Sequence, residues 1–179
     1  ILKRIMIYAT KRIRDYNALA SIKTLEDVHA GLSQMDDLSW APQLPKLKKL
    51  QIFSETYKSY EPLGRCAALE DLKIWRMRHT VDVAQFADGL GKAPIKKLSL
   101  SGTEIQNEAK LAALAAAPLA DLNLSFVNPK SKNTVDLTFV GSLEKLKTLN
   151  LNGAKIANFA AVGKCRNLLS LYAACEGFD

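Results

Sequence analysis

One pattern recurs along the whole chain and constrains its fold more than any other feature. The pattern is apolar-x-x-apolar-x-apolar, and it is clearest in Ile95-Lys96-Lys97-Leu98-Ser99-Leu100 and in Leu146-Lys147-Thr148-Leu149-Asn150-Leu151. Eight copies start at residues 2, 25, 47, 69, 95, 119, 146 and 168, which gives periods of 22 to 27 residues. Units of this length cannot bury an apolar face alone, so they stack on one another. The sequence therefore predicts one repeat domain over residues 1–179.

The segments between the copies repeat as well. In the 22-residue units one column holds Met35, Tyr57 and Ile156, and another holds Cys66 and Cys165. Such columns predict return segments that pack against their neighbours, with the cysteines as small apolar fillers. Local signals add helices over residues 81–90 and 104–116, a protruding loop over residues 128–133, and extended or single-turn returns at Pro42, Pro45 and Pro62.

The frame resembles that of the leucine-rich repeat family. Within it, Leu100-Ser101-Gly102-Thr103-Glu104-Ile105 is similar to the 22-residue repeats of bacterial, internalin-like members. The resemblance implies the α/β class and a right-handed solenoid (horseshoe) of about eight repeats. In that fold a parallel β-sheet forms the concave face, and helices or turns form the convex face.

One position departs from the family pattern. The family places Asn or Cys three residues after the last strand leucine, whereas this chain has Thr10, Ser33, Glu55, Met77, Thr103, Val127, Ala154 and Glu176. Threonine and serine still bond to nearby backbone groups, but the apolar side chains do not.

The resemblance also implies that the strand residues between the inward leucines form the concave face, which in this family usually binds a protein. The first column of these residues alternates in charge, in the order Arg4, Asp27, Lys49, Asp71, Lys97, Asp121, Thr148, Ser170. We interpret the alternation as avoidance of like-charge repulsion between neighbouring strands, in preference to a charge code read by a partner.

The other two columns differ between the halves of the chain. The N-terminal half carries large aromatic and basic residues, which are typical of binding hot spots, and the C-terminal half carries Ser, Asn and Ala. Packing beneath an N-terminal cap, or simple cross-strand stabilisation, is the alternative explanation. The predicted partner-binding residues are Tyr8, His29, Gln51, Phe53, Lys73, Trp75 and Arg76.

Catalytic, metal and cofactor motifs are missing from the sequence. His29 and His79 are the only histidines, and neither belongs to a recognisable triad or zinc spacing. Gly89-Leu90-Gly91-Lys92 lacks the spacing of a phosphate-binding loop and is interpreted as a helix end. We therefore expect no enzyme activity, no cofactor and no metal.

These observations predict a protein–protein interaction scaffold. One specific form is an immunity or inhibitor-type protein, by resemblance to ribonuclease inhibitor. The net charge of +7 suggests an acidic partner. Nucleic-acid binding, or a regulatory domain of a larger protein, is the alternative function. For nucleic acid, the lysine column of Lys3, Lys48, Lys96 and Lys147 argues in favour, and the concave aspartates argue against.

Three further expectations concern the setting of the chain. No apolar stretch is long enough to span a bilayer, so we expect no membrane association. Three cysteines without a CxxC motif favour reduced thiols and the cytoplasm, with Cys175 as the most accessible thiol. Both ends look uncapped, which leaves room for flanking sequence or for self-association through the ends.

Overall fold

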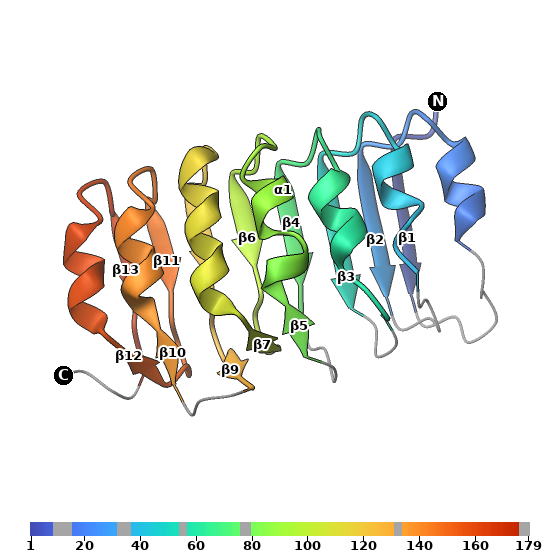
Figure 1. Ribbon diagram of the computed structural model, residues 1–179. Coiled ribbons are helices and arrows are strands. Elements are labelled where there is room, and N and C mark those ends of the chain that lie inside the picture. The colour runs from blue at the N-terminus through green and yellow to red at the C-terminus, as the bar shows by residue number, and fades with distance from the viewer. Residues whose placement is uncertain (9–15, 32–36, 54–56, 76–79, 131–133, 176–179) are drawn as a thin grey trace.

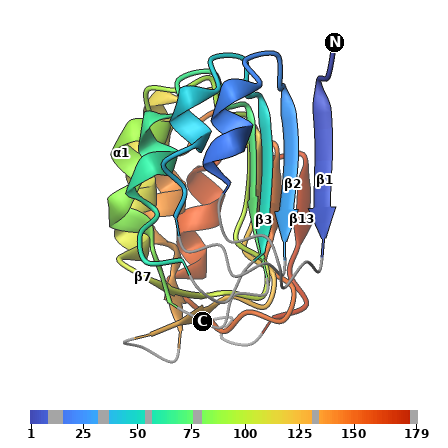
Figure 2. The same ribbon diagram turned by 90° about the vertical axis from the view of Figure 1, so that its right-hand side faces the viewer.

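The chain winds through stacked coils, each made of a strand, a turn and a return segment. The computed structural model describes residues 1–8, 16–31, 37–53, 57–75, 80–130 and 134–175. Long strands form one layer and short helices form the opposite layer (Figure 1), and Figure 2 shows the two layers side by side. The predicted leucine-rich repeat architecture, with eight strands in one parallel sheet, is confirmed.

The main sheet follows the repeat frame strand by strand. All neighbours are parallel and adjoin in chain order, so Leu50 is paired with Val28 on one side and with Leu72 on the other. The strands are β1 (Arg4–Tyr8), β2 (Asp27–Gly31), β3 (Lys49–Phe53), β4 (Asp71–Ile74), β6 (Lys97–Ser99), β8 (Asp121–Asn123), β11 (Thr148–Asn150) and β13 (Ser170–Tyr172).

One side of this sheet forms the core. Successive side chains of a strand point to opposite faces, so the repeat leucines of β3 and β4 are fully buried while the residues between them face outward. The predicted cysteine column is also buried, with Cys66 at 4% and Cys165 at 6% exposure. The outward side of the main sheet is called the sheet face below.

In the described ranges the return segments are short 3-10 helices, and one of them also contains a short α-helix. Pro42 and Pro62 lie in the first turns of η2 and η3, where a missing N–H costs no hydrogen bond. Single-turn returns at these prolines are therefore confirmed. The helices are η1 (Asn17–Ser21), η2 (Ala41–Gln43), η3 (Glu61–Arg65), η4 (Val83–Gln85), α1 (Ala87–Leu90), η5 (Glu108–Ala116), η6 (Leu137–Ser142) and η7 (Phe159–Lys164).

The two predicted longer helices are wrong in their first residues. The segment 81–90 opens with strand β5 (Val81–Asp82) and reaches α-helical geometry only in α1. The segment 104–116 opens with strand β7 (Glu104–Gln106), and the left-handed residue Asn107, at φ 60°, separates it from η5. The β-branched Val81 and Ile105 pair with each other, so tertiary pairing overrides the helical spacing.

The predicted loop over residues 128–133 is also wrong at its start. Asn128 and Pro129 form strand β9, which pairs with β7 at the edge of a small sheet ordered β5-β7-β9. A proline fits at such an edge because no ladder hydrogen bond is required of its nitrogen. Residues 131–133 lie outside the described residues. A second small sheet joins β10 (Val135–Asp136) to β12 (Ile156–Ala157).

Aspartate caps and left-handed asparagines join the helical returns. Asp136 begins η6 and accepts hydrogen bonds from the backbone N–H of Thr138 and from the side-chain amide of Asn158 in the next coil. Asp82 accepts the same two kinds of bond, from Ala84 and from Asn107. The repeated motif ties each cap to the following return, so these coils are cross-linked by side chains as well as by packing.

The turns after the main strands close without the family asparagine. Thr103 is buried and donates its hydroxyl hydrogen to the Leu100 carbonyl at 2.6 Å. Val127 and Ala154 are buried too, and their backbone N–H groups donate to Leu124 and Leu151. Backbone bonds therefore satisfy these turns where the side chain has no polar atom. Residues 10, 33, 55, 77 and 176 lie outside the described residues.

Candidate binding surface on the sheet

Three aromatic rings form a row across the N-terminal half of the sheet face. The rings of Tyr8 and Phe53 are stacked, with centroids 5.8 Å apart. Phe53 and Trp75 are tilted against each other at 4.9 Å. Tyr8 remains 47% exposed and Phe53 is half-buried. The structure thus brings these three residues together on the sheet face, and they are called the aromatic row below.

A glycine allows the row to form. Gly31 lies in register between Tyr8 and Phe53, on the strand that separates theirs. A β-carbon added to Gly31 would lie 2.0 Å from the Phe53 ring, far inside van der Waals contact. The ring therefore covers the bare backbone of β2 and reaches Tyr8 on the second strand away.

A lysine completes the row at its inner end. The ammonium group of Lys73 lies 5.0 Å from the centroid of the Trp75 ring, within the range of a cation–π contact. Gln51, on the strand between, pairs in register with Lys73 and with His29. Arg76, also predicted to bind, lies outside the described residues.

His29 links the aromatic row to the charged column. One ring nitrogen, Nε2, lies 3.0 Å from the Asp27 carboxylate, and the other, Nδ1, lies 3.0 Å from the Tyr8 hydroxyl. A neighbouring carboxylate favours the tautomer with the proton on Nε2, and in that tautomer the Tyr8 hydroxyl donates to Nδ1. Arg4 donates to the same carboxylate at 2.8 Å. With both nitrogens engaged, His29 fixes the position of the Tyr8 ring.

The charged column is paired across the strands. Besides the contact of Arg4 with Asp27, Lys97 lies 3.2 Å from Asp121 on the next strand. Burial raises the pKa of Asp71, although the neighbouring Lys97 and Lys49 act in the opposite direction. The column thus neutralises itself, in agreement with the structural interpretation of its alternation.

The C-terminal half of the sheet face is polar and is hollowed where its side chains are smaller. A hollow of about 250 Å³ lies over β6, β8 and β11, between Lys73 on one side and Tyr172 on the other. The amide oxygens of Asn123 and Asn150 accept from backbone N–H groups two residues further on, which leaves the amide nitrogens as outward donors. The sheet face therefore divides into an aromatic half and a hydrogen-bonding half.

Comparison with solved structures identifies the fold. The chain superimposes on an internalin (inlF) of Listeria monocytogenes with a TM-score of 0.72 at 19% identity, covering 94% of this chain and 47% of that one. Internalin C2 (inlC2) of the same organism gives 0.72 at 18%, covering 98% and 73%. The chain has the leucine-rich repeat fold of the internalins. No family model and no curated protein matches the sequence.

More distant leucine-rich repeat structures have the same fold. The plant peptide hormone receptor RGFR1, solved in complex with RGF2, gives a TM-score of 0.65 at 15% identity and covers 90% of this chain and 26% of that one. This chain spans about half of the inlF structure and about a quarter of the receptor. The fold likeness to the two internalins covers 94% and 98% of this chain.

Three features of the internalin-like sheet escape the sequence prediction. In the sequence alone, Gly31 only interrupts the aromatic column, and Asp27 is only one charge of an alternating series. Phe126 has φ 54° and occupies the turn position that Gly102 and Gly153 fill in the neighbouring coils, at 67° and 69°. It is 65% exposed and its ring lies over Gly153. Alignment of the turns Leu100-Ser101-Gly102 and Leu124-Ser125-Phe126 reveals this phenylalanine.

Other groups with reactive side chains give no site among the described residues. No group of three or more His, Cys, Asp or Glu residues in the described ranges is arranged to hold a metal ion. Burial raises the pKa of the Cys66 thiol to about 12, and Cys175 is half-buried. None of the described helices has the length and hydropathy that crossing a bilayer requires.

Proposed function

We propose that this chain is a non-enzymatic scaffold that binds a partner protein through the aromatic half of its sheet face. The aromatic row carries this proposal, because its rings stand on the outward side of the sheet and are held there by Gly31 and His29. Met6, beside it, is 50% exposed. Contiguous exposed aromatic and apolar groups are uncommon on monomers and are the usual centre of protein interfaces.

Two further observations support a binding role. RGFR1, a structure of similar fold, is a plant peptide hormone receptor solved in complex with RGF2. The charged column beside the row is neutralised by its own pairs, so it offers a partner little net attraction. Apolar contact with the rings, surrounded by polar groups that exclude water, fits the composition of a hot spot.

The experiment is capture of the partner from native cells on immobilised protein. Phe53→Ala and Trp75→Ala are expected to abolish capture of the protein that the parent chain retains, since each variant removes a ring that anchors the interface. Tyr172→Ala is the control, because Tyr172 is an exposed aromatic, 52%, at the other end of the sheet. Circular dichroism confirms that each variant is folded. Undiminished capture by both row variants would rule out this surface.

An immunity or inhibitor-type activity is the specific form that we propose for this scaffold. Support comes from the resemblance to ribonuclease inhibitor and from the extended sheet face, which is long enough to cover an active site. If the captured partner is an enzyme, one equivalent of the chain should suppress its activity, and Trp75→Ala should not. Full enzyme activity in the saturated complex would exclude the inhibitor form while leaving the scaffold role intact.

The cytoplasm is the location that we propose for this function. Cys66 and Cys165 are free thiols inside the core, and both have raised pKa values because they are buried. Reduced core cysteines fit a compartment that keeps thiols reduced. Fractionation of native cells tests the location, and recovery of the chain outside the cytoplasm would contradict it.

A further inference from the structure

The net charge of the chain is concentrated on one edge of the solenoid. This edge consists of the ends of the helices and the connections that lead from them to the next strand. It carries ten basic residues, Lys23, Lys46, Lys48, Arg65, Lys92, Lys96, Lys145, Lys147, Lys164 and Arg166, here called the basic edge. Its acidic residues are three, Glu26, Glu70 and Glu144. The excess over these residues is seven, and Lys3, which precedes β1 as Lys48 precedes β3, lies on the same edge and raises the excess to eight.

Much of the positive charge on this edge is unneutralised. Both Glu26 and Glu70 are paired with lysine. Glu26 contacts Lys3 at 3.0 Å and Lys48 at 3.7 Å, and Glu70 contacts Lys96 at 2.7 Å. Within the described part of the chain, seven exposed cations of the edge take part in no ion pair: Lys23, Lys46, Lys92, Lys145, Lys147, Lys164 and Arg166. Basic groups near helix C-termini complement the helix dipole, but the helices here are only one to three turns long.

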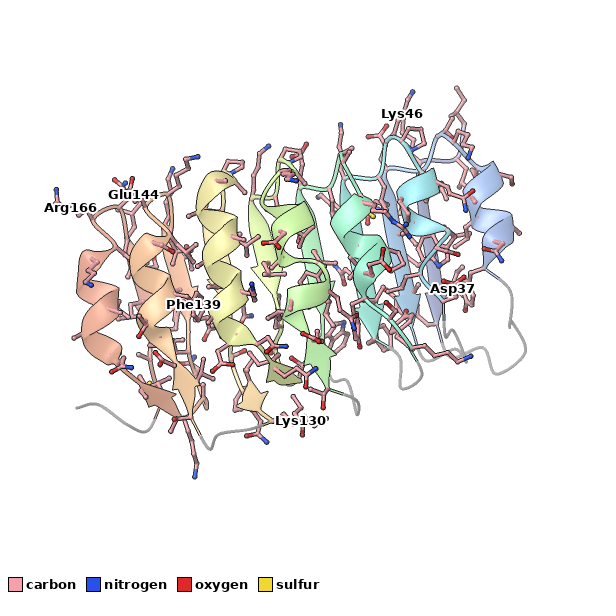
Figure 3. All side chains as sticks on the ribbon, in the orientation of Figure 1. Asp37, Lys46, Lys130, Phe139, Glu144 and Arg166 are labelled. Carbon is pink, nitrogen blue, oxygen red and sulfur yellow. The ribbon has the colours of Figure 1, made fainter. Side chains whose placement is uncertain are left out.

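The basic edge is long and is hollowed at one end. Figure 3 shows Lys46 and Arg166 at opposite ends of the upper edge, with Glu144 near Arg166. They are separated by five strand spacings, roughly 24 Å. A hollow of about 550 Å³ is lined by Glu144, Lys164 and Arg166, together with Gly141 and Gly163. A β-carbon at Gly163 would meet nothing within 4 Å, so the floor of this hollow is open to an incoming side chain.

We propose that the basic edge is a second contact surface, which binds an acidic polypeptide segment of the partner. This inference rests on the proposed function, because the acidic segment belongs to the same partner protein that the sheet face binds. Lys48, Lys96 and Lys147 directly precede strands β3, β6 and β11, so a protein that covers the sheet face also reaches this edge. An acidic rim on that protein would be steered to the edge and held beside it.

The composition of the edge favours a polypeptide over nucleic acid or a lipid surface. No aromatic residue occurs in residues 22–26, 44–48, 65–70, 91–96, 117–120, 143–147 or 164–169, so nothing there stacks on bases or enters a bilayer interface. Eight of the ten cations are lysine, whereas arginine is the better bidentate ligand for phosphate. The three interspersed glutamates would repel a continuous phosphate backbone but can face lysines of a protein.

The test compares two double variants of equal charge. Lys92→Glu with Arg166→Glu reverses charge on the basic edge, and Lys110→Glu with Lys130→Glu reverses it elsewhere. Lys110 and Lys130 are exposed, and Lys130 lies at the opposite edge in Figure 3. Binding of fluorescent poly-L-glutamate is measured by anisotropy at low salt. The edge variant is expected to bind about tenfold more weakly than the parent, and the control variant less than about threefold.

Several results would overturn the inference. Equal weakening by both double variants would show that only net charge matters. Tighter binding of a 20-nucleotide single-stranded RNA, with a steep salt dependence, would assign the edge to nucleic acid, and binding to vesicles with 30% phosphatidylserine would assign it to a lipid surface. Loss of partner capture in Trp75→Ala with unchanged poly-L-glutamate binding separates the sheet face from the edge, so either proposal can fail alone.

Discussion

The aromatic row depends on a residue that contributes no side chain, and this dependence can be measured. Replacing Gly31 with alanine places a methyl group where the Phe53 ring lies, 2.0 Å from its nearest carbon. The backbone of Gly31 is outside the left-handed region, so alanine is tolerated there in itself. The ring must therefore swing away and lose its contacts with Tyr8 and Trp75.

The size of the effect follows from these contacts. Two aromatic pairs contribute about 0.5–1.5 kcal/mol each, so displacement of the Phe53 ring costs roughly 1–3 kcal/mol. Alanine in place of glycine in a strand stabilises the fold by about 0.5–1 kcal/mol, because the unfolded chain then has less conformational freedom to lose. We expect Gly31→Ala to destabilise the fold by roughly 0.5–2 kcal/mol. In a Phe53→Ala background there is no ring to displace, so the same change should be neutral or stabilising.

Urea denaturation followed by circular dichroism measures all four proteins of this double-mutant cycle. The coupling energy should be about 1–3 kcal/mol in favour of the double variant. Additive effects, within about 0.5 kcal/mol, would show that Gly31 does not support the Phe53 ring. Gly31→Ala should also weaken capture of the partner although it removes no contacting atom. Unchanged capture together with a destabilised fold would make the row a stabilising feature of the sheet alone.

Three other expectations concern single positions. Gly153→Ala should cost about 1–2 kcal/mol, because Gly153 has φ 69° and an aromatic ring lies against it, while Gly163→Ala should be neutral; equal melting temperatures would contradict this. Burial raises the pKa of Asp71, so its contribution to stability is present at acidic pH and lost as the pH rises through that pKa. Asp71→Asn should then be more stable than the parent near pH 7, with the difference closing toward pH 3, as urea midpoints will report. Iodoacetamide at pH 8 should label Cys175 first and leave Cys66 protected by its pKa of about 12; mass spectrometry showing the reverse order would refute this.

The repeat frame was predictable because burial imposes it on every coil. A leucine such as Leu72 has the same neighbours in the strands on both sides, so its position follows from periodicity alone. The face that carries Tyr8, Phe53 and Trp75 was predictable for the same reason, since the alternation of a strand assigns each residue to a side. Whether the aromatic rings touch depends on how far each side chain extends across the neighbouring strands, and the repeat spacing does not determine this.

The missed features depend on local backbone geometry and on contacts between coils. Spacing of apolar residues does not distinguish the 3-10 helix η5 from an α-helix, and it did not show that Ile105 belongs to a strand. The contact of His29 with Asp27 joins two residues on one face of the same strand, and strand alternation alone does not fix how close their side chains come. Phe126 would have been recognised from the glycines at the equivalent turn positions.

The ring contact across Gly31 has a consequence for how the molecule unfolds. In a solenoid each coil contacts only its neighbours, so stability is close to a sum of coil and neighbour energies, and terminal coils fray first. Tyr8 and Phe53 depart from this rule because they connect the first and third strands across the second. Loss of β1 therefore weakens β3 directly. We expect the amides of the first three strands to exchange hydrogen as one cooperative block, with no separate opening of the first.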